Sequence, residues 1–298
     1  MMAKANTFAD LLNIQGFNCT SGWLHRFKNR HGINWAHKEH GEAASVDKNV
    51  VTDWKSQVNE LCKDYKDEDI FNADETGLFY QLLPSGTMKF KHEKCVGGKL
   101  SKVRVSILIA ASLTGEKLKP MVIGKSLNPR CFKNINKKNL GVYYRNNSKA
   151  WMTTCLFNEW LNIINNNFKA EKRNVILFVD NFAGHKVQVP LSNINVQFYP
   201  ANCTSLIQPC DQGIIANIKK HYKDGIIGDV ISQLDNSYSS ELVIDIRDAC
   251  DRISRAWDLV KDSTITNCFI NAGHKLKTKE APDISLVVEP PVSDEIWQ

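Results

Sequence analysis

An unbroken apolar run that closes on an acid, from Val175 to Asp180, constrains the fold of this chain more than any other stretch. Apolar runs without alternation are typical of strands buried on both faces, as in parallel sheets. Parallel neighbours need a crossover connection, and residues 152–168 upstream have the apolar spacing of a crossover helix. Asp180 therefore stands at the C-terminal end of a buried strand, which is a poor position for an ordinary surface charge.

Two more acids occupy comparable positions. Residues 69–74 predict a short strand that ends on Asp74, with Gly77 permitting a turn after it. Beyond a further strand at 195–199, Asp211 precedes a segment with helical apolar spacing and is expected on the first turn of that helix. Two strand-borne acids and one helix-borne acid suit divalent metal, because hard cations take oxygen ligands. Three carboxylates can serve a pair of ions ~3.5–4 Å apart.

Short motifs stand in order along the chain: NADETG at 72–77, LKPMVIG at 118–124, AWMT at 150–153, VDNFAGH at 179–185 and QPCDQG at 208–213. This series resembles the DDE superfamily endonuclease domain of Tigger and pogo transposases and of their jerky and centromere protein B relatives. The resemblance implies that Asp74, Asp180 and Asp211 are the catalytic acids and the ligands of Mg²⁺ or Mn²⁺, with two ions. It implies hydrolysis of a DNA phosphodiester and then attack of the freed 3′-hydroxyl on a second strand, without a small-molecule cofactor.

The fold expected from these patterns is α/β. Residues 103–111 and 118–124 predict a hairpin around Thr114 and Gly115, which with the Asp74 strand makes an antiparallel meander. Together with the parallel strands and flanking helices this is a ribonuclease-H-like mixed sheet, as the resemblance implies. We expect an endonuclease domain at 68–274, a linker and helix at 36–67, and a disordered tail at 275–298, where the composition is polar and proline-containing.

Residues 1–35 are expected to form a small α-helical unit, the remnant of a helix-turn-helix. Ser21 can cap a helix that Gly32 terminates, and its side chains outside the apolar face are the candidate DNA contacts. These are His25, Arg26, Lys28, Asn29 and Arg30. By itself the pattern favours a solvated amphipathic helix. Its resemblance to the end of a centromere-protein-B-type helix-turn-helix favours a major-groove reader instead. Family members have more sequence before this point, so either the gene model is truncated or half of a bipartite DNA reader has been lost.

Composition agrees with a nuclear DNA-binding protein without establishing one. The formal net charge of +6 is compatible with double-stranded DNA as the partner. The nine cysteines include no Cys-x-x-Cys pair, which fits a reducing compartment and indicates neither a disulfide framework nor a zinc site. No apolar run is long enough to span a bilayer, so no membrane association is expected. A homodimer is left open.

Several neighbours of the acids are ambiguous. Strand alternation sends Glu75 to the face opposite Asp74, which predicts that Glu75 is not a ligand. Asn181 and His185 follow the Asp180 strand, and His185 could contact a phosphate or a water, or make a hydrogen bond within its loop. Gln208 and Gln212 bracket Asp211 and could hold DNA or cap the helix.

Two other functions compete with an active nuclease. In a domesticated nuclear DNA-binding or chromatin protein, the fold would persist while catalysis is unused. A metal-dependent phosphatase or other hydrolase is disfavoured because the basic N-terminal helix would have no role in it.

Overall fold

The computed structural model describes residues 5–6, 9, 11–12, 14, 16–30, 48–82, 103–235 and 243–277. The chain divides into two compact units, residues 1–44 and 45–298. The expectations for most of the linker, residues 36–47, and for the tail beyond residue 277 lie outside the described residues. No helix in the described part of the chain is long and apolar enough to cross a membrane.

The first unit contains helix α2, Ser21–Arg30. Its N-terminus differs from the expectation by one residue, because the hydroxyl of Thr20 accepts from the backbone N–H of Trp23 at 3.2 Å. Thr20, rather than Ser21, therefore caps the helix. The ring of Trp23 stacks on Phe27 and meets Phe17 edge-on, both at 5.0 Å between ring centroids. These contacts define the apolar face of α2.

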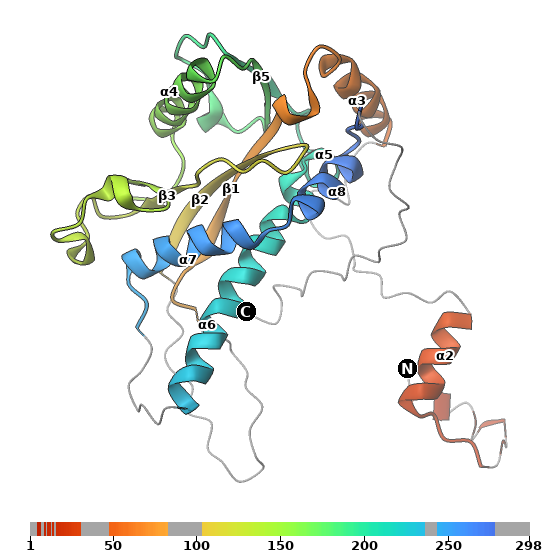
Figure 1. The fold of residues 1–298 in the computed structure, drawn as a ribbon. Coiled ribbons are helices and arrows are strands. Elements are labelled where there is room, and N and C mark those ends of the chain that lie inside the picture. Colours follow the sequence, from red (N-terminus) through yellow and green to blue (C-terminus); the bar gives the residue numbers. More distant parts are fainter. Residues whose placement is uncertain are drawn as a thin grey trace. The chain divides into compact units, whose positions relative to one another are not determined.

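The second unit is built on a six-stranded mixed sheet with the order β4-β3-β2-β1-β5-β6 (Figure 1). Its strands are β1 Ile70–Phe79, β2 Arg104–Ser112, β3 Met121–Gly124, β4 Tyr143–Asn146, β5 Val175–Val179 and β6 Ile194–Phe198. The pairs β1–β2 and β2–β3 are antiparallel, whereas β1–β5 and β5–β6 are parallel. This confirms the expected meander followed by parallel strands, and with it the ribonuclease-H-like architecture.

Strand β1 is longer than the sequence predicts. The expected turn at Gly77 is wrong, because β2 pairs with β1 along its whole length and Gly77 lies opposite Ser106. Asp74 consequently lies in the middle of the strand rather than at its end. Cross-strand hydrogen bonds thus override the turn preference of a single glycine.

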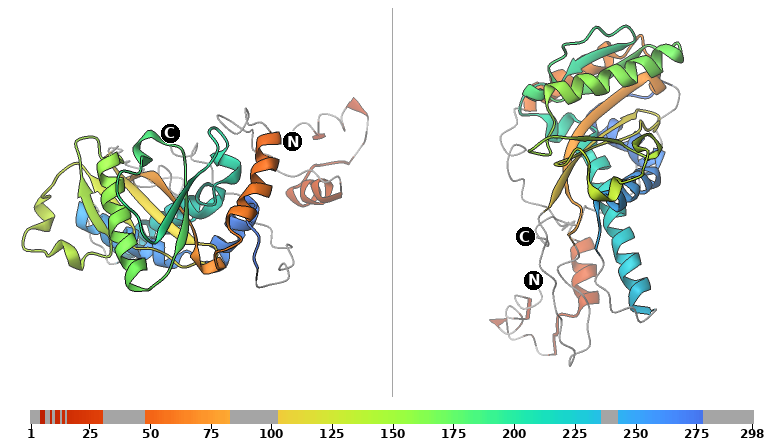
Figure 2. Two further views of the ribbon diagram at one scale, coloured as in Figure 1. Left: turned by 90° about the horizontal axis from the view of Figure 1, so that it is seen from above. Right: turned by 90° about the vertical axis from the view of Figure 1, so that its left-hand side faces the viewer.

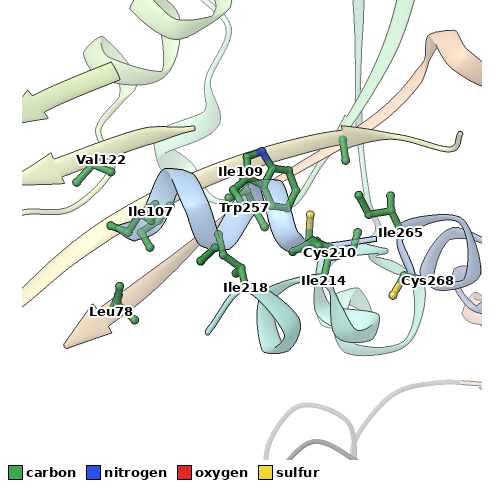
Figure 3. Packing of buried hydrophobic residues seen from close by; sticks show 14 of the residues in the cluster. Leu78, Ile107, Ile109, Val122, Cys210, Ile214, Ile218, Trp257, Ile265 and Cys268 are labelled. Atoms are coloured by element: carbon green, nitrogen blue, oxygen red, sulfur yellow. The ribbon is translucent and has the colours of Figure 1, made fainter. Parts of the chain in front are cut away.

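Helices cover both faces of the sheet, as the two views of Figure 2 also show. They are α3 Lys48–Leu61, α4 Thr154–Ala170, α5 Thr204–Ile207, α6 Ile215–Asp235, α7 Ile246–Leu259 and α8 Asp262–Ala272. On one face, Trp257 of α7 and Ile218 of α6 belong to the same buried cluster as Ile107 and Ile109 of β2 (Figure 3). The other face packs on α4 in a second cluster. Alternate residues of β1 enter the two clusters, as a pleated strand requires.

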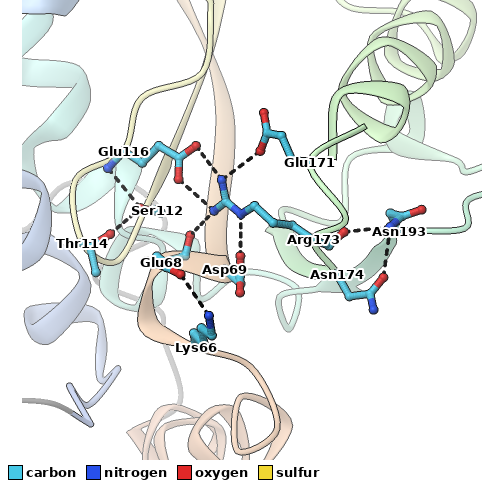
Figure 4. Close-up of polar contacts among 10 residues, drawn as sticks. All are labelled: Lys66, Glu68, Asp69, Ser112, Thr114, Glu116, Glu171, Arg173, Asn174 and Asn193. Atoms are coloured by element: carbon cyan, nitrogen blue, oxygen red, sulfur yellow. Dashed lines mark hydrogen bonds and ion pairs between the residues drawn. The ribbon is translucent and has the colours of Figure 1, made fainter. Parts of the chain in front are cut away.

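Arg173, two residues before β5, joins the amino ends of β1 and β5, which lie away from the acids (Figure 4). Its guanidinium donates to Asp69 at 2.8 Å and to both carboxylate oxygens of Glu116 at 3.0 and 2.8 Å. Hydrogen bonds to these carboxylates raise the pKa of Arg173. Because Asp69 precedes β1 and Glu116 lies in the β2–β3 turn, one planar side chain fixes three segments at this edge.

A buried histidine, His274, packs between β5 and α8. His274 is 3% exposed, its ring meets Phe178 and Phe269 edge-on at 5.4 and 5.1 Å, and its Nε2 has no hydrogen-bond partner among the described residues. Burial lowers the pKa of His274 from 6.5 to about 3. The folded protein therefore holds this ring in its neutral form.

This burial predicts an acid sensitivity. Between pH 6.5 and about 3 the unfolded chain binds a proton at His274 that the folded chain does not, so stability is lost as pH falls through that window. The loss is about 1.4 kcal/mol per pH unit. We expect His274→Leu to remove this dependence in urea titrations repeated at several pH values, with His221→Leu on α6 as the comparison. Parallel curves for wild type and His274→Leu would contradict the expectation.

Candidate active site

Two of the predicted acids lie side by side at the centre of the sheet. Asn72 of β1 is in register with Phe178 of the parallel strand β5. The hydrogen-bonded pairing ends there, and Asp74 and Asp180 each lie two residues further along, near enough for the charge of Asp180 to add to the burial that raises the pKa of Asp74. The expectation that these two acids come from neighbouring strands is confirmed.

Asp211 is held by irregular backbone rather than by the first turn of a regular helix. It lies in a π-helical turn, Cys210–Ile214, that is broken at Gly213, where φ is +136°. Helix α6 begins only after this turn, at Ile215. The side-chain amide of Gln212 donates to the backbone carbonyl of Ser205 at 2.7 Å and ties the turn to α5. The predicted helix exists, but it starts one turn after Asp211.

One buried amide connects all three acid-bearing segments. The Asn72 side chain, 0% exposed, donates to the Phe178 carbonyl at 3.0 Å and accepts from the Cys210 backbone N–H at 2.8 Å. Each of these residues lies one or two positions before an acid: Asn72 before Asp74, Phe178 before Asp180 and Cys210 before Asp211. Asn72 therefore sets the relative positions of the backbones that carry the three carboxylates.

Removing this amide should be costly. Asn72→Leu keeps a side chain of similar size but leaves the Phe178 carbonyl and the Cys210 N–H without their buried partner. Unsatisfied buried groups cost ~1–3 kcal/mol each. We expect a loss of roughly 2–4 kcal/mol in the free energy of unfolding from urea titration, whereas Asn195→Leu on the half-exposed strand β6 should lose far less. A stability equal to wild type would show that the amide does not join these segments.

The negative charges of the acids interact electrostatically. Asp74 is 8% exposed, and burial together with the negative charges of Asp211, Glu75 and Asp180 raises its pKa well above the ordinary value. The same charges of Asp74 and Asp211 contribute to the raised pKa of the buried Cys210 thiol, after burial itself. Clustered carboxylates repel unless a cation neutralises them. The three predicted acids thus share one electrostatic environment.

The structure resolves the ambiguity at Glu75 and His185. Glu75 lies on the face of β1 opposite Asp74, and there its carboxylate contacts the Nε2 of His185 at 2.9 and 3.0 Å. The Nδ1 of the same ring lies 2.5 Å from the carboxylate of Asp180. His185, 1% exposed, therefore links Glu75 to the candidate acid Asp180.

Both ring nitrogens of His185 face carboxylates. Burial alone would lower the pKa of His185, but its hydrogen bonds to Asp180 and Glu75 outweigh burial and raise the pKa to about 10. The ring also packs on Phe157 at 4.6 Å and meets Phe182 edge-on at 5.5 Å. The charged imidazole is consequently fixed in position by two acids and two aromatic rings.

The remaining candidate residues differ in their exposure to solvent. Asn181 is exposed at the end of β5, while Gln208 is 1% exposed with its Oε1 lacking a hydrogen-bond partner among the described residues. In α2 the side chains of His25, Arg26 and Arg30 are exposed and Lys28 is half-buried, whereas the side chain of Asn29 lies outside the described residues. Nothing in these positions tests their predicted contacts with DNA.

The donor set suits a hard divalent cation. Asp74, Asp180 and Asp211 offer only oxygen. Burial raises the pKa of Asp74, and the negative charges of Asp211 and Asp180 add to that rise, which a bound cation would oppose. Within the described residues, no three ligating side chains stand close enough together to hold an ion in their present positions. The oxygen donors and the clustered negative charge suit Mg²⁺ or Mn²⁺, although the side chains as they stand do not form a closed ligand set.

Comparisons with protein families cover both units. The DDE superfamily endonuclease family matches residues 102–269, and the Tc5 transposase DNA-binding domain matches residues 1–35. Tigger transposable element-derived protein 4 of Mus musculus is 36% identical over 274 residues, which are 91% of this chain and 52% of that protein. Jerky protein homolog of Homo sapiens is 33% identical over 74% of this chain and 42% of its own length.

The chain is also similar, at lower identity, to a further curated protein and to solved structures. Major centromere autoantigen B of Homo sapiens is 27% identical over 300 residues, 91% of this chain and 48% of that protein. The chain spans about half the length of the curated relatives it matches. Among solved structures, the Mos1 transposase paired-end complex with left transposon end has a TM-score of 0.41 and 11% identity, covering 93% of this chain and 80% of that one.

Proposed function

Because the chain belongs to the DDE superfamily endonucleases, in the Tigger and centromere-autoantigen-B-like group, we propose that it is a nuclear DNA-binding protein that cuts and joins DNA phosphodiesters with Asp74, Asp180 and Asp211. The observation that supports this most directly is the side chain of Asn72, which bonds to the two other segments that carry these acids. A buried hydrogen bond network that joins the three acid-bearing segments is expected for a shared site and not for three unrelated surface charges.

The proposed roles follow from the positions of the side chains. Asp74, Asp180 and Asp211 would hold Mg²⁺ or Mn²⁺, with two ions in the full site. Such ions activate the attacking oxygen and stabilise the leaving one. His185, which Glu75 holds from behind, orients the Asp180 carboxylate, and Asn72 sets the distance between the strands and the turn of Asp211. No covalent intermediate with the protein is needed.

Binding of double-stranded DNA is proposed for α2, through His25, Arg26, Lys28, Asn29 and Arg30. The match of residues 1–35 to a transposase DNA-binding domain supports this role. Phosphate contacts position a protein on DNA and base contacts specify a site. A domain organisation of residues 1–35 for DNA binding and 68–274 for cleavage follows from the proposal.

The test is conversion of supercoiled plasmid to the nicked form by the purified full chain, with Mg²⁺ or Mn²⁺ against a chelator control. Metal-dependent nicking supports the proposal. DNA binding without nicking under either cation would overturn the catalytic role and favour the second candidate, a domesticated DNA-binding or chromatin protein. Major centromere autoantigen B of Homo sapiens, which is 27% identical over 91% of this chain, supports that second candidate.

A further inference from the structure

A cationic pocket lies apart from the three acids, at the ends of several strands. Its described lining residues are Phe79, Arg104, Lys125 and Lys149, and its volume is about 290 Å³. Building on the proposed function, we propose that this pocket binds a phosphodiester group of the DNA strand that runs past the acids. Nothing in the sequence motifs assigns a role to these four residues.

The sheet topology explains why these residues converge. Phe79 at the end of β1 is in register with Arg104 at the start of β2. Lys125 directly follows β3, whose last residue is in register with Asn146 of the parallel strand β4. Lys149 lies three residues beyond that strand. The pocket therefore lies at the carboxyl ends of β1, β3 and β4 and the amino end of β2, whereas β5 ends earlier, beside the middle of β1.

Arg104 is fixed rather than free on the surface. Its guanidinium carbon lies 5.0 Å from the centroid of the Trp151 ring, a cation–π distance. Gly77 makes room for the arginine stem, because a Cβ at that position would lie 3.0 Å from the Arg104 Cδ. A planar guanidinium held on an aromatic ring suits recognition of phosphate oxygens, which it can bind in bidentate fashion. Lys125 and Lys149 are exposed and add point charges.

Among the described residues, the lining of the pocket carries positive charge and no acid. Across the described ranges, no ion pair engages Arg104, Lys125 or Lys149. Phe79, 45% exposed, adds an aromatic surface at the rim. In a duplex the bases are stacked on one another, so the part of this pocket that duplex DNA would contact is its three cations, which can neutralise backbone phosphates.

The position relative to the acids fits one continuous strand. Phe79 is five residues beyond Asp74 on β1, a distance of about 16 Å along a strand. This corresponds to roughly five base pairs of duplex at 3.4 Å each. The pairing of β1 with β5 ends at Asn72, so between Asp74 and Phe79 no described strand occupies that edge of β1. Phe79 and Gly77 share the face of β1 that carries Glu75, opposite Asp74, so DNA that contacts both the acids and the pocket would cross this uncovered edge of β1.

The test uses the full chain without divalent cation, so that binding is measured apart from cleavage. We expect the triple variant Arg104→Gln, Lys125→Gln and Lys149→Gln to bind a fluorescent duplex at least tenfold more weakly at low salt. The slope of log K against log salt should fall by about 0.9 for each phosphate that the variant no longer neutralises. The matched control is Arg255→Gln, Lys169→Gln and Lys261→Gln, three exposed cations without ion pairs in the described residues, which should change the slope far less.

Two results would overturn the proposal. In the first, the triple variant has an unchanged thermal midpoint and the affinity and salt slope of wild type. In the second, inorganic phosphate binds to wild type but not to the variant while DNA affinity is equal in both, which would assign the pocket to free phosphate. Neither result bears on metal-dependent nicking by the acids, so failure of the pocket and failure of the proposed function remain distinguishable.

Discussion

Asp180→Asn is expected to abolish metal-dependent plasmid nicking while DNA retention on a column stays near that of wild type. The substitution preserves the size of the side chain but removes the negative charge from one of the three proposed cation ligands. Metal-assisted stabilisation of the reacting oxygens is worth several kcal/mol. Its loss corresponds to a decrease in rate on the order of 10³-fold or more.

The control is Asp224→Asn, an exposed acid on α6. It should nick at the wild-type rate. Undiminished nicking by Asp180→Asn would refute the assignment of the acids, and loss of DNA retention together with nicking would point to misfolding instead. Thermal midpoints with and without Mg²⁺ separate these cases, because a cation that binds only the folded state raises the midpoint of wild type.

His185→Ala is expected to have the largest effect on stability. It removes the only described side chain that faces the Glu75 carboxylate, whose side chain is 6% exposed and adjacent to the buried Asp74. Breaking a buried ion pair by deleting one partner costs ~3–5 kcal/mol, since the other charge is left uncompensated. Urea titration of the metal-free protein measures this loss.

A double variant separates the ion pair from packing. Glu75→Ala with His185→Ala removes both partners, so its loss should be smaller than the sum of the two single losses, by a coupling of ~0.5–3 kcal/mol. Strict additivity would mean that His185 stabilises the fold through Asp180 and its ring contacts with Phe157 and Phe182, and not through Glu75. A positioning role also requires that His185→Ala weaken the Mg²⁺-induced rise in thermal midpoint, which simple packing would not do.

The sheet and the adjacency of Asp74 and Asp180 were predictable because buried strands have strong sequence patterns. An apolar run that closes on an acid determines both the strand and the place of its last side chain, and the apolar spacing of α4 requires the crossover. The length of β1 was not predictable in the same way. A glycine such as Gly77 permits a turn, and only the pairing with β2 decides that the strand continues.

The interaction of Glu75 with His185 could not be read from alternation alone. Alternation correctly places Glu75 opposite Asp74, but it does not reveal what covers that face. The short helical turn Ala183–His185 folds back beneath β5 and brings the imidazole there from 110 residues away. A histidine five residues after a strand-ending acid is the only sequence signal, and it is a weak one.

The break at Gly213 has a consequence for how this architecture tolerates change. Because the backbone conformation at this glycine interrupts the regular helix, Asp211 takes its position from Asn72 and from the contact of Gln212 with Ser205, not from the axis of α6. A bend in α6, or an extension at its carboxyl end near Asp235, need not displace Asp211. The outer part of α6 is accordingly where insertions and new attachments can accumulate over evolution with little disturbance of the chemistry.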